Sequence, residues 1–157
     1  MKKSILFFPR LICFAIFAFL LLQCKKADAP PKPASELILG SWVMKSYAYN
    51  PAYDFLGNGT KITDLFAQFP ACFQDDIYTF KTSGQGVIDE STTKCDAADP
   101  QTFPFTWELK NNNTILYVDF LAEDYTIVQL DNTTGKLSRT IIEAGITYTE
   151  TIVFARK

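Results

Sequence analysis

Cys24 is the residue of this sequence with the most specific chemistry. It ends the lipobox-like tetrad 21–24, and the unbroken apolar run 11–22 leads to it from a start that contains Lys2, Lys3 and Arg10. A basic start followed by a short apolar run and a cleavage motif is typical of a bacterial signal peptide. We therefore expect residues 1–23 to be a lipoprotein signal peptide and Cys24 to carry a lipid.

Retention of this segment as a membrane-spanning helix is the alternative. A spanning helix needs about 20 consecutive apolar residues, whereas Pro9 and Arg10 interrupt any longer apolar segment here. Gln23 occupies a position where a lipobox usually has glycine, alanine or serine, so the sequence leaves the efficiency of processing open. Lipidation predicts a protein of the bacterial cell envelope, held at the outer membrane and facing the periplasm or the cell surface.

Cys72 and Cys95 are the next candidates for covalent chemistry. Cys13 would leave with the signal peptide and Cys24 would carry the lipid, so these two cysteines remain as a pair. A cysteine pair in an exported protein usually forms a disulfide. A metal site is the weaker alternative, because the chain has no histidine and two thiolates do not complete a tetrahedral zinc shell. We expect a Cys72–Cys95 disulfide, no metal and no cofactor.

Nucleophilic catalysis is not expected from this sequence. Histidine, the commonest general base, is absent, and no Gly-x-Ser-x-Gly motif occurs. Carboxylates cluster at 75–76, at 89–90, and at Asp96 with Asp99. They are interpreted as solvated strand ends and loop residues, with a calcium site near Cys95 as the alternative. We therefore expect a protein that is not an enzyme.

A charged pair lies in the last predicted hairpin. With a two-residue loop at 144–145, Arg139 opposes Glu150 and Ile141 opposes Tyr148, and the apolar residues of this face predict that it points inward. The pair is then a satisfied internal ion pair, a pair turned to solvent, or a group that contacts a ligand. Ala144 is a poor residue for the positive φ of a type I′ turn, and a bulged loop would shift this register.

The organisation of the chain supports one tethered domain. The residues after position 23 suffice for one domain with a core and are too few for two. The first 23 residues carry basic and no acidic side chains, so their removal leaves an acidic chain, and no nucleic-acid partner is expected. Residues 24–36 are predicted to be the lipidated cysteine and a proline-rich tether, which could hold the domain 37–157 roughly 30 Å from a bilayer.

The domain divides into short strand-like segments separated by turn residues. We predict eight strands, at approximately 37–48, 76–81, 86–91, 102–109, 114–120, 124–130, 136–142 and 146–156. Within the connection 49–75, the spacing of Ile62, Leu65, Phe66 and Phe69 predicts a short amphipathic helix that Pro70 ends. Eight antiparallel strands with one apolar face leave two long edges unless the sheet closes, so we predict an all-β up-and-down barrel.

Alternation within the strands predicts which side chains face the barrel interior. In the segment 102–109, Phe103, Phe105 and Trp107 share one face while polar residues share the other. In the first strand, strict alternation groups Trp42, Met44, Ser46 and Ala48. A barrel of eight strands encloses space either for filling side chains or for one small ligand.

Gly40 and Trp42 form a Gly-x-Trp motif in the first predicted strand, and Arg156 lies near the end of the last one. This motif, the terminal arginine and eight strands resemble the lipocalin-like domain of bacterial lipoproteins. The stretch from Cys72 through Asp75-Asp76 to Cys95 is also similar to that group. The resemblance implies that Arg156 packs over Trp42, and that the barrel is a binding module for a small hydrophobic or amphiphilic ligand.

Under this resemblance, the candidate ligand-binding residues are Phe103, Phe105, Trp107, Arg139, Tyr148 and Glu150. The apolar residues among them would contact a hydrocarbon part, and Arg139 with Glu150 would orient a polar or anionic head group. The alternative is a filled barrel that acts as a structural or protein-interaction module through its rim loops, with a protein partner that the sequence does not identify.

Strand parity makes a further prediction about the two cysteines. If the first strand runs from the closed end to the open end, the odd-numbered connections all lie at the open end. Cys72 is in the first connection and Cys95 is in the third, so both lie at the same rim. By the same count the last strand ends at the closed end, which returns Arg156 to Trp42.

Overall fold

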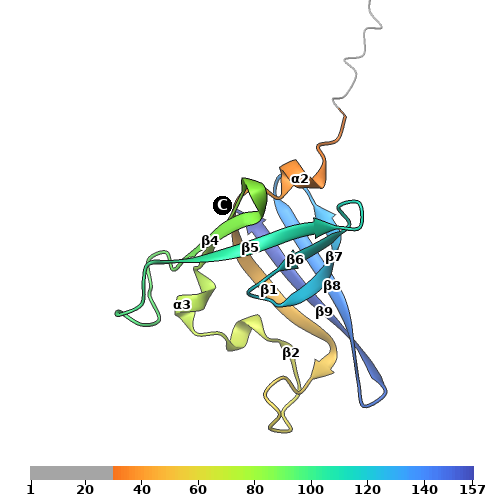
Figure 1. The fold of residues 1–157 in the computed structure, drawn as a ribbon. Helices are drawn as coiled ribbons and strands as arrows, with labels where there is room; N and C mark the ends of the chain where they lie inside the picture. Colours follow the sequence, from red (N-terminus) through yellow and green to blue (C-terminus); the bar gives the residue numbers. More distant parts are fainter. Residues whose placement is uncertain (1–29) are drawn as a thin grey trace, which may run out of the picture. The chain divides into compact units, whose positions relative to one another are not determined.

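A closed antiparallel barrel forms the domain in the computed structural model, which describes residues 30–157 (Figure 1). The nine strands follow the order β2-β1-β3-β4-β5-β6-β7-β8-β9, and β1 also pairs with β9, so that eight strands close the ring and β2 extends β1 beside it. Their bounds are β1 Gly40–Tyr53, β2 Ile62–Asp64, β3 Ile77–Lys81, β4 Gln85–Asp89, β5 Thr102–Lys110, β6 Ile115–Val118, β7 Glu123–Leu130, β8 Thr134–Glu143 and β9 Ile146–Arg156. The predicted eight-stranded barrel is confirmed.

Each predicted strand of the barrel has a counterpart in the structure, and the main difference is at the start of β1. Helix α2 (Ala34–Leu37) occupies residues assigned to the tether and to the first strand, and β1 begins only at Gly40. Pro33 precedes this helix, and a proline with fixed φ is favourable at a helix start. Among the described residues, none of the helices is long and apolar enough to cross a membrane.

A β-bulge in β1 corrects the predicted inward face of that strand. Met44 pairs with Phe154 and Ser46 pairs with Val153, so β1 has one residue more than β9 between these two pairs. An extra residue reverses the alternation beyond it. Tyr47 and Tyr49 therefore face the interior in place of Ser46 and Ala48, because the strict alternation assumed from the sequence ends at Lys45.

The helix predicted at 62–69 is wrong in its position. Residues Ile62–Asp64 form β2, which pairs with the far half of β1, and Phe66–Gln68 form only one 3-10 turn, η1. The short helix α3 (Ala71–Gln74) begins directly after Pro70. Proline was interpreted as a helix end, whereas here it precedes a helix, a position that its fixed φ favours. Pairing with the exposed edge of β1 outweighs the helical spacing of the four apolar residues.

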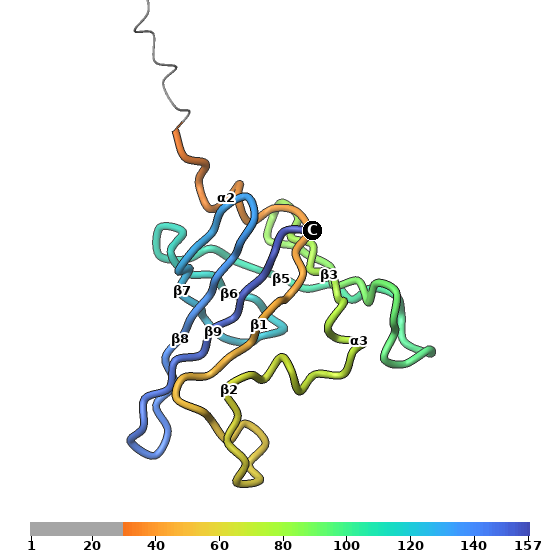
Figure 2. Tube along the Cα trace, turned by 180° about the vertical axis from the view of Figure 1, so that it is seen from behind, coloured from red at the N-terminus to blue at the C-terminus, as the bar shows by residue number. Residues whose placement is uncertain are grey.

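The two ends of the barrel differ, and we call them the base and the mouth. The base holds Gly40, the β3–β4 turn 82–84 and Arg156, and the mouth holds the β8–β9 turn and the β4–β5 loop 90–101. The 62–75 segment begins at the mouth and runs beside β1 in the opposite direction, toward β3, as the trace in Figure 2 shows. It packs against β1 through Leu65, which is buried and donates its backbone N–H to Tyr47 O at 2.8 Å.

The β8–β9 hairpin has the register predicted from the sequence. Glu143 pairs with Ile146, Arg139 with Glu150 and Ile141 with Tyr148. Ala144 and Gly145 form the turn with φ values of 50° and 78°, which fits the positive φ at both central positions of a type I′ turn. The hairpin therefore holds Ala144 in a left-handed conformation that L-residues with a Cβ disfavour.

Replacing Ala144 with asparagine should stabilise the domain. Asn-Gly is the preferred pair for a type I′ turn, so we expect the free energy of unfolding to rise by about 0.5–1 kcal/mol. Urea unfolding followed by circular dichroism measures this. Ala97→Asn, in the exposed β4–β5 loop where φ is not positive, is the matched control and should bring no such gain. Equal stability of the Ala144 variant and the wild type would contradict the strain argument.

Candidate functional site

The base of the barrel is closed by Trp42 and Arg156. The Arg156 guanidinium lies over the Trp42 ring, with Cζ 4.0 Å from the ring centroid. Its Nη2 donates to Leu37 O at 2.8 Å and its Nη1 donates to Leu39 O, while Trp42 Nε1 donates to Ile38 O at 2.8 Å. These three donors thus bind the carbonyls that precede β1, while Arg156 Nε donates to Asn132 O at 3.5 Å.

Gly40 is required at this contact for two reasons. Its φ is +109°, a conformation that side chains disfavour, and a Cβ at this position would lie 2.8 Å from Arg156 Nη1. The Gly-x-Trp motif therefore has a structural role at the base, where it admits the arginine, rather than a role in contacting a ligand.

Side chains fill the interior between the base and the middle of the barrel. Phe105 is 3% exposed and packs edge-to-face against Phe80 and Phe120. Gly86 makes room for this ring, because a Cβ there would lie 2.2 Å from Phe105 Cζ. A cavity of about 20 Å³ remains near Trp42, with an apolar lining. Ligand pockets usually measure about 300–1,000 Å³, so this space does not hold a small molecule.

Trp107 belongs to this packed region and not to the mouth. Its ring packs edge-to-face against Phe80, and its Nε1 lies 2.8 Å from Gln85 O and 3.1 Å from Lys81 O, next to the β3–β4 turn. Both carbonyls accept from the indole N–H. This indole is therefore fixed at the base by backbone contacts.

A buried polar cluster occupies the mouth half of the barrel. We call the four residues Tyr47, Tyr125, Arg139 and Glu150 the mouth cluster. Glu150 is 0% exposed, and its Oε1 accepts from the Tyr47 hydroxyl at 2.6 Å and from the Tyr125 hydroxyl at 2.5 Å. Its Oε2 accepts from Arg139 Nε at 2.7 Å. Both oxygens of this buried carboxylate thus have partners.

Arg139 connects the mouth cluster to the barrel surface. Its Nη1 lies 2.9 Å from Glu123 Oε1, and its side chain is 25% exposed whereas that of Glu123 is 52% exposed. The guanidinium also lies over the Tyr125 ring, 5.5 Å from the centroid. Arg139 is therefore held in one orientation by Glu150 and Glu123, and its side chain remains partly accessible.

The tyrosines of the mouth cluster stay protonated in this setting. Burial, followed by the hydrogen bond to Glu150, raises the pKa of Tyr47 well above its ordinary value, and the same two causes raise the pKa of Tyr125. Because their hydroxyls donate to a carboxylate, deprotonation would replace attraction by repulsion between two anions. The cluster is thus set up to hold charge in place rather than to transfer protons near neutral pH.

Aromatic rings continue the mouth cluster toward solvent. Tyr148 is 6% exposed and its ring centroid lies 4.9 Å from that of Tyr53. Tyr49 lies 5.0 Å from Tyr53 and 6.2 Å from Phe55, centroid to centroid. We call these four residues the mouth aromatic group. Phe55 is 47% exposed, so the group reaches the surface of the mouth.

The six residues proposed from the sequence as a ligand site fall into separate regions. Arg139, Glu150 and Tyr148 lie toward the mouth, whereas Phe105 and Trp107 belong to the packed region near the base. Phe103 pairs with Ile88 in the half nearer the mouth. Phe103, Phe105 and Trp107 lie at different depths because β5 runs the length of the barrel and carries its inward residues from the mouth to the base.

Sequence reasoning missed Tyr47, Tyr125 and Glu123. Tyr125 shares a face with Ile127 in an alternating strand, so its inward orientation was available from the sequence. The inward orientation of Tyr47 could not be predicted, because the bulge after Met44 reverses the alternation of the strand. No sequence pattern indicates the role of Glu123, because its contact with Arg139 depends on the register between β7 and β8.

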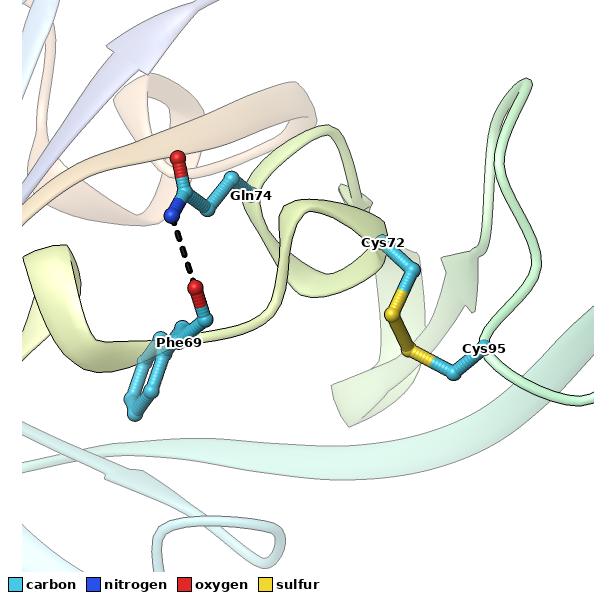
Figure 3. The surroundings of a disulfide bond; sticks show 4 residues. All are labelled: Phe69, Cys72, Gln74 and Cys95. Atoms are coloured by element: carbon cyan, nitrogen blue, oxygen red, sulfur yellow. Dashed lines mark hydrogen bonds between the residues drawn. A yellow bond between two sulfur atoms is a disulfide. The ribbon is translucent and has the colours of Figure 1, made fainter.

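The disulfide joins helix α3 to the β4–β5 loop at the mouth. Cys72 and Cys95 are bonded with a Cα–Cα distance of 5.2 Å across 23 residues of sequence, as Figure 3 shows. Gln74 Nε2 in the same helix donates to Phe69 O at 2.8 Å. The two cysteines therefore lie at the same rim, and the bond ties the 62–75 segment to the rest of the mouth.

Replacing both cysteines with serine should lower the free energy of unfolding by about 3 kcal/mol, the loop-closure value for a disulfide of this span. Chemical unfolding of the wild type and the double variant measures the difference. Addition of a reductant should reproduce the loss in the wild type and leave the variant unchanged. Peptide mapping that finds both thiols free in protein from an oxidising compartment would contradict the prediction.

Two carboxylates at the mouth are buried, which corrects their interpretation as solvated strand ends. Asp76 and Glu90 are each 5% exposed, whereas Asp96 and Asp99 in the β4–β5 loop are exposed as expected. Burial, followed by the charge of Glu90, raises the pKa of Asp76 to about 6. Asp76 follows the inward alternation of Tyr78 and Phe80, so an extension of that pattern by one step would have placed it inside.

A family model agrees with this architecture. The family model described as a lipocalin-like domain matches residues 38–137. Among solved structures, that of the siderocalin Ex-FABP, described as functioning through dual ligand specificities, is similar at 13% identity with a TM-score of 0.38, covering 77% of this chain and 71% of that one. No curated protein sequence matches. Because the family model covers more than half of the sequence, the chain belongs to the lipocalin-like domain family.

Proposed function

We propose that this protein is a lipid-anchored lipoprotein of the bacterial envelope whose barrel binds a small hydrophobic or amphiphilic molecule at its mouth. The anchor rests on the signal-peptide pattern before Cys24, which lies outside the described residues. The binding role rests on membership of the lipocalin-like family and on the mouth cluster. Attachment at the outer membrane, facing the periplasm or the cell surface, is part of the same proposal.

The fixed and partly exposed position of Arg139 is the main observation in favour of the binding role. A buried ion pair contributes little to stability compared with well-packed apolar residues, so an apolar pair could fill the same space in a barrel that had only to fold. Glu150 holds Arg139 Nε at 2.7 Å and so fixes the guanidinium. The Arg139 side chain is 25% exposed. A fixed guanidinium binds carboxylate or phosphate oxygens through paired hydrogen bonds.

The mouth aromatic group supplies the apolar half of the proposed site. Tyr53 at the end of β1 packs against Tyr148 on β9, and Phe55 in the loop after β1 packs against Tyr49. Aromatic rings provide large contact areas for apolar groups. The small cavity near Trp42 leaves no room for a chain that enters deeply. The ligand is therefore bound at the mouth, with its head group at Arg139 and its apolar part against these rings.

The ligand proposal is tested with an alkyl carboxylate and the alkyl alcohol of the same length, by calorimetric titration of the lipid-free domain. Arg139→Lys keeps the counter-charge for Glu150 and removes the guanidinium fork. It should weaken carboxylate binding about tenfold and leave the alcohol unaffected, because a charge-assisted pair contributes about 1.5–3 kcal/mol. Lys110→Met is the matched control, since Lys110 forms an ion pair with Asp124 at 2.8 Å in a different part of the barrel.

Failure of every amphiphile to bind, with nothing extracted from the purified domain by organic solvent, would overturn the ligand proposal. Binding that Arg139→Lys and Lys110→Met reduce equally would overturn the role of Arg139 in it. The protein would then be interpreted through the second candidate function.

The second candidate is a filled barrel that binds a protein partner through its rim. The exposed apolar residues at the mouth favour it. Phe55 and Leu56, in the loop between β1 and β2, are 47% and 62% exposed, and Ile142 and Ile146, on the strands beside the β8–β9 turn, are 73% and 42% exposed. Exposed apolar residues that gather in one region mark interaction sites. Under this candidate, Ile142→Ser with Leu56→Ser should abolish partner crosslinking, whereas substitution of Arg139 should not.

The anchor proposal is tested separately. Cys24→Ala should release the protein from membranes and abolish labelling with palmitate, because the lipid is the proposed attachment. Cys13→Ala, inside the signal peptide, is the matched control and should be labelled like the wild type. If Cys24→Ala remains membrane-bound and the wild type takes up no label, the segment 1–23 is a retained span.

A further inference from the structure

Asp76 and Glu90 are two buried carboxylates with the same charge and without a counter-charge. Each is 5% exposed. Asp76 directly precedes β3 and Glu90 directly follows β4, and the last pair of that ladder is Ile77 with Asp89, so the two residues lie across from each other. Within residues 30–157, neither has a lysine or arginine within ion-pair distance.

One oxygen of each carboxylate lacks a partner. Asp76 Oδ1 and Glu90 Oε2 are buried and accept no hydrogen bond in the described structure. Asp75 Oδ1 is a third buried oxygen without a partner, although Asp75 Oδ2 accepts from Thr92 Oγ1 at 2.7 Å. Asp89 Oδ1, by contrast, accepts from the side-chain amide of Gln101 at 2.8 Å. A buried anionic oxygen without a partner is strongly unfavourable. The two unpartnered oxygens therefore indicate a missing positive partner.

We propose that Asp76 and Glu90 bind a hard divalent cation at the mouth of the barrel. Carboxylate oxygens are the ligands that such cations prefer, and Ca²⁺ tolerates irregular coordination that includes backbone carbonyls and water. No three of the described cysteine and carboxylate side chains converge into a metal-binding group. The two carboxylates therefore supply the charge, and backbone oxygens and water complete the coordination.

The surroundings favour a small ion over a larger cationic group. The neighbouring segments are held closely, because Glu90 N donates to Gln101 O at 3.1 Å and the Cys72–Cys95 bond fixes α3, which ends one residue before Asp75, to the β4–β5 loop. Thr92 Oγ1 and Asp75 Oδ2 join the same two segments. Rigid oxygen ligands on two covalently joined segments are suited to an ion that links them.

The proposal is tested with Ca²⁺ and the lipid-free, disulfide-bonded domain at pH 7.5. Millimolar Ca²⁺ should raise Tm by about 5 °C over the same protein in chelator, because a ligand that binds only the folded state stabilises it. Asp76→Asn and Glu90→Gln should each abolish this rise. Asp99→Asn, on the exposed loop of the same rim, is the matched control and should retain it.

Terbium provides a second measurement that does not depend on the stability of the variants. Tyr78 lies two residues from Asp76, so Tb³⁺ bound at this site should give tyrosine-sensitised luminescence that Ca²⁺ displaces. An equal Tm rise with NaCl at matched ionic strength, a rise that survives in both Asp76→Asn and Glu90→Gln, or the absence of any Ca²⁺ effect together with no Tb³⁺ signal would overturn the proposal.

Discussion

Replacing Glu150 with alanine is expected to lower the free energy of unfolding by about 3–5 kcal/mol, the range for removal of one partner from a buried ion pair. The variant would leave Arg139 Nε and the hydroxyls of Tyr47 and Tyr125 without their acceptor, since all three donate to this carboxylate. A buried donor without a partner has lost its hydrogen bonds to water and forms none within the protein, which destabilises the folded state. Urea unfolding followed by tryptophan fluorescence measures the loss.

A double variant separates the charge effect from simple loss of volume. Glu150→Leu with Arg139→Met should recover much of the stability that Glu150→Leu alone loses, because an apolar pair of similar volume replaces a buried ion pair at little cost. Asp124→Ala is the matched control. It breaks the Lys110–Asp124 pair, whose side chains are 36% and 49% exposed, and it should cost less than about 1 kcal/mol. A loss this small in Glu150→Ala would contradict the buried-pair interpretation.

The same comparison bears on function. If the apolar double variant folds at least as stably as the wild type, the mouth cluster is not needed for stability. The presence of these four polar residues would then be explained by ligand binding through Arg139, which is fixed and partly accessible. If the double variant remains as unstable as the single one, the cluster is structural, and the filled-barrel candidate gains support over the ligand-binding candidate.

Closure of the barrel could be predicted from local features of the sequence. Strand alternation, turn residues and the two-residue loop at 144–145 each reflect short-range physics, and together they predicted the Arg139–Glu150 pairing that the structure contains. Strand parity also placed the two cysteines at one rim. In each case the inference needed only the order of the strands and the period of two along them.

What the sequence could not predict depends on contacts between distant segments. The bulge after Met44 leaves no mark in composition, yet it decides that Tyr47 and not Ser46 reaches Glu150. Pairing with β1 likewise made Ile62 part of a strand despite its helical spacing. The depth of each inward side chain also depends on strand position within the barrel, which is why Trp107 and Arg139 are not in one site.

Trp42→Ala is the second substitution with a large expected effect. Trp42 is 1% exposed and its Nε1 donates to Ile38 O, so truncation removes a large core side chain and leaves a cavity. We expect a loss of about 3–5 kcal/mol in the free energy of unfolding, as for other buried aromatic truncations. Chemical unfolding followed by circular dichroism measures it. Trp107→Ala is the comparison, because that tryptophan is only partly buried, and its loss should be smaller.

Coupling between Trp42 and Arg156 tests how the base is closed. Arg156→Ala alone loses the hydrogen bonds to Leu37 O and Leu39 O together with the cation–π contact at 4.0 Å from the ring centroid. In Trp42→Ala the arginine has already lost the ring, so the second substitution should cost less by the cation–π contribution, about 0.5–2 kcal/mol. Losses that add within about 0.3–0.5 kcal/mol would show that the two side chains act independently. Coupling above that range would instead show that β1 and β9 are joined at the base by this contact as well as by their ladder.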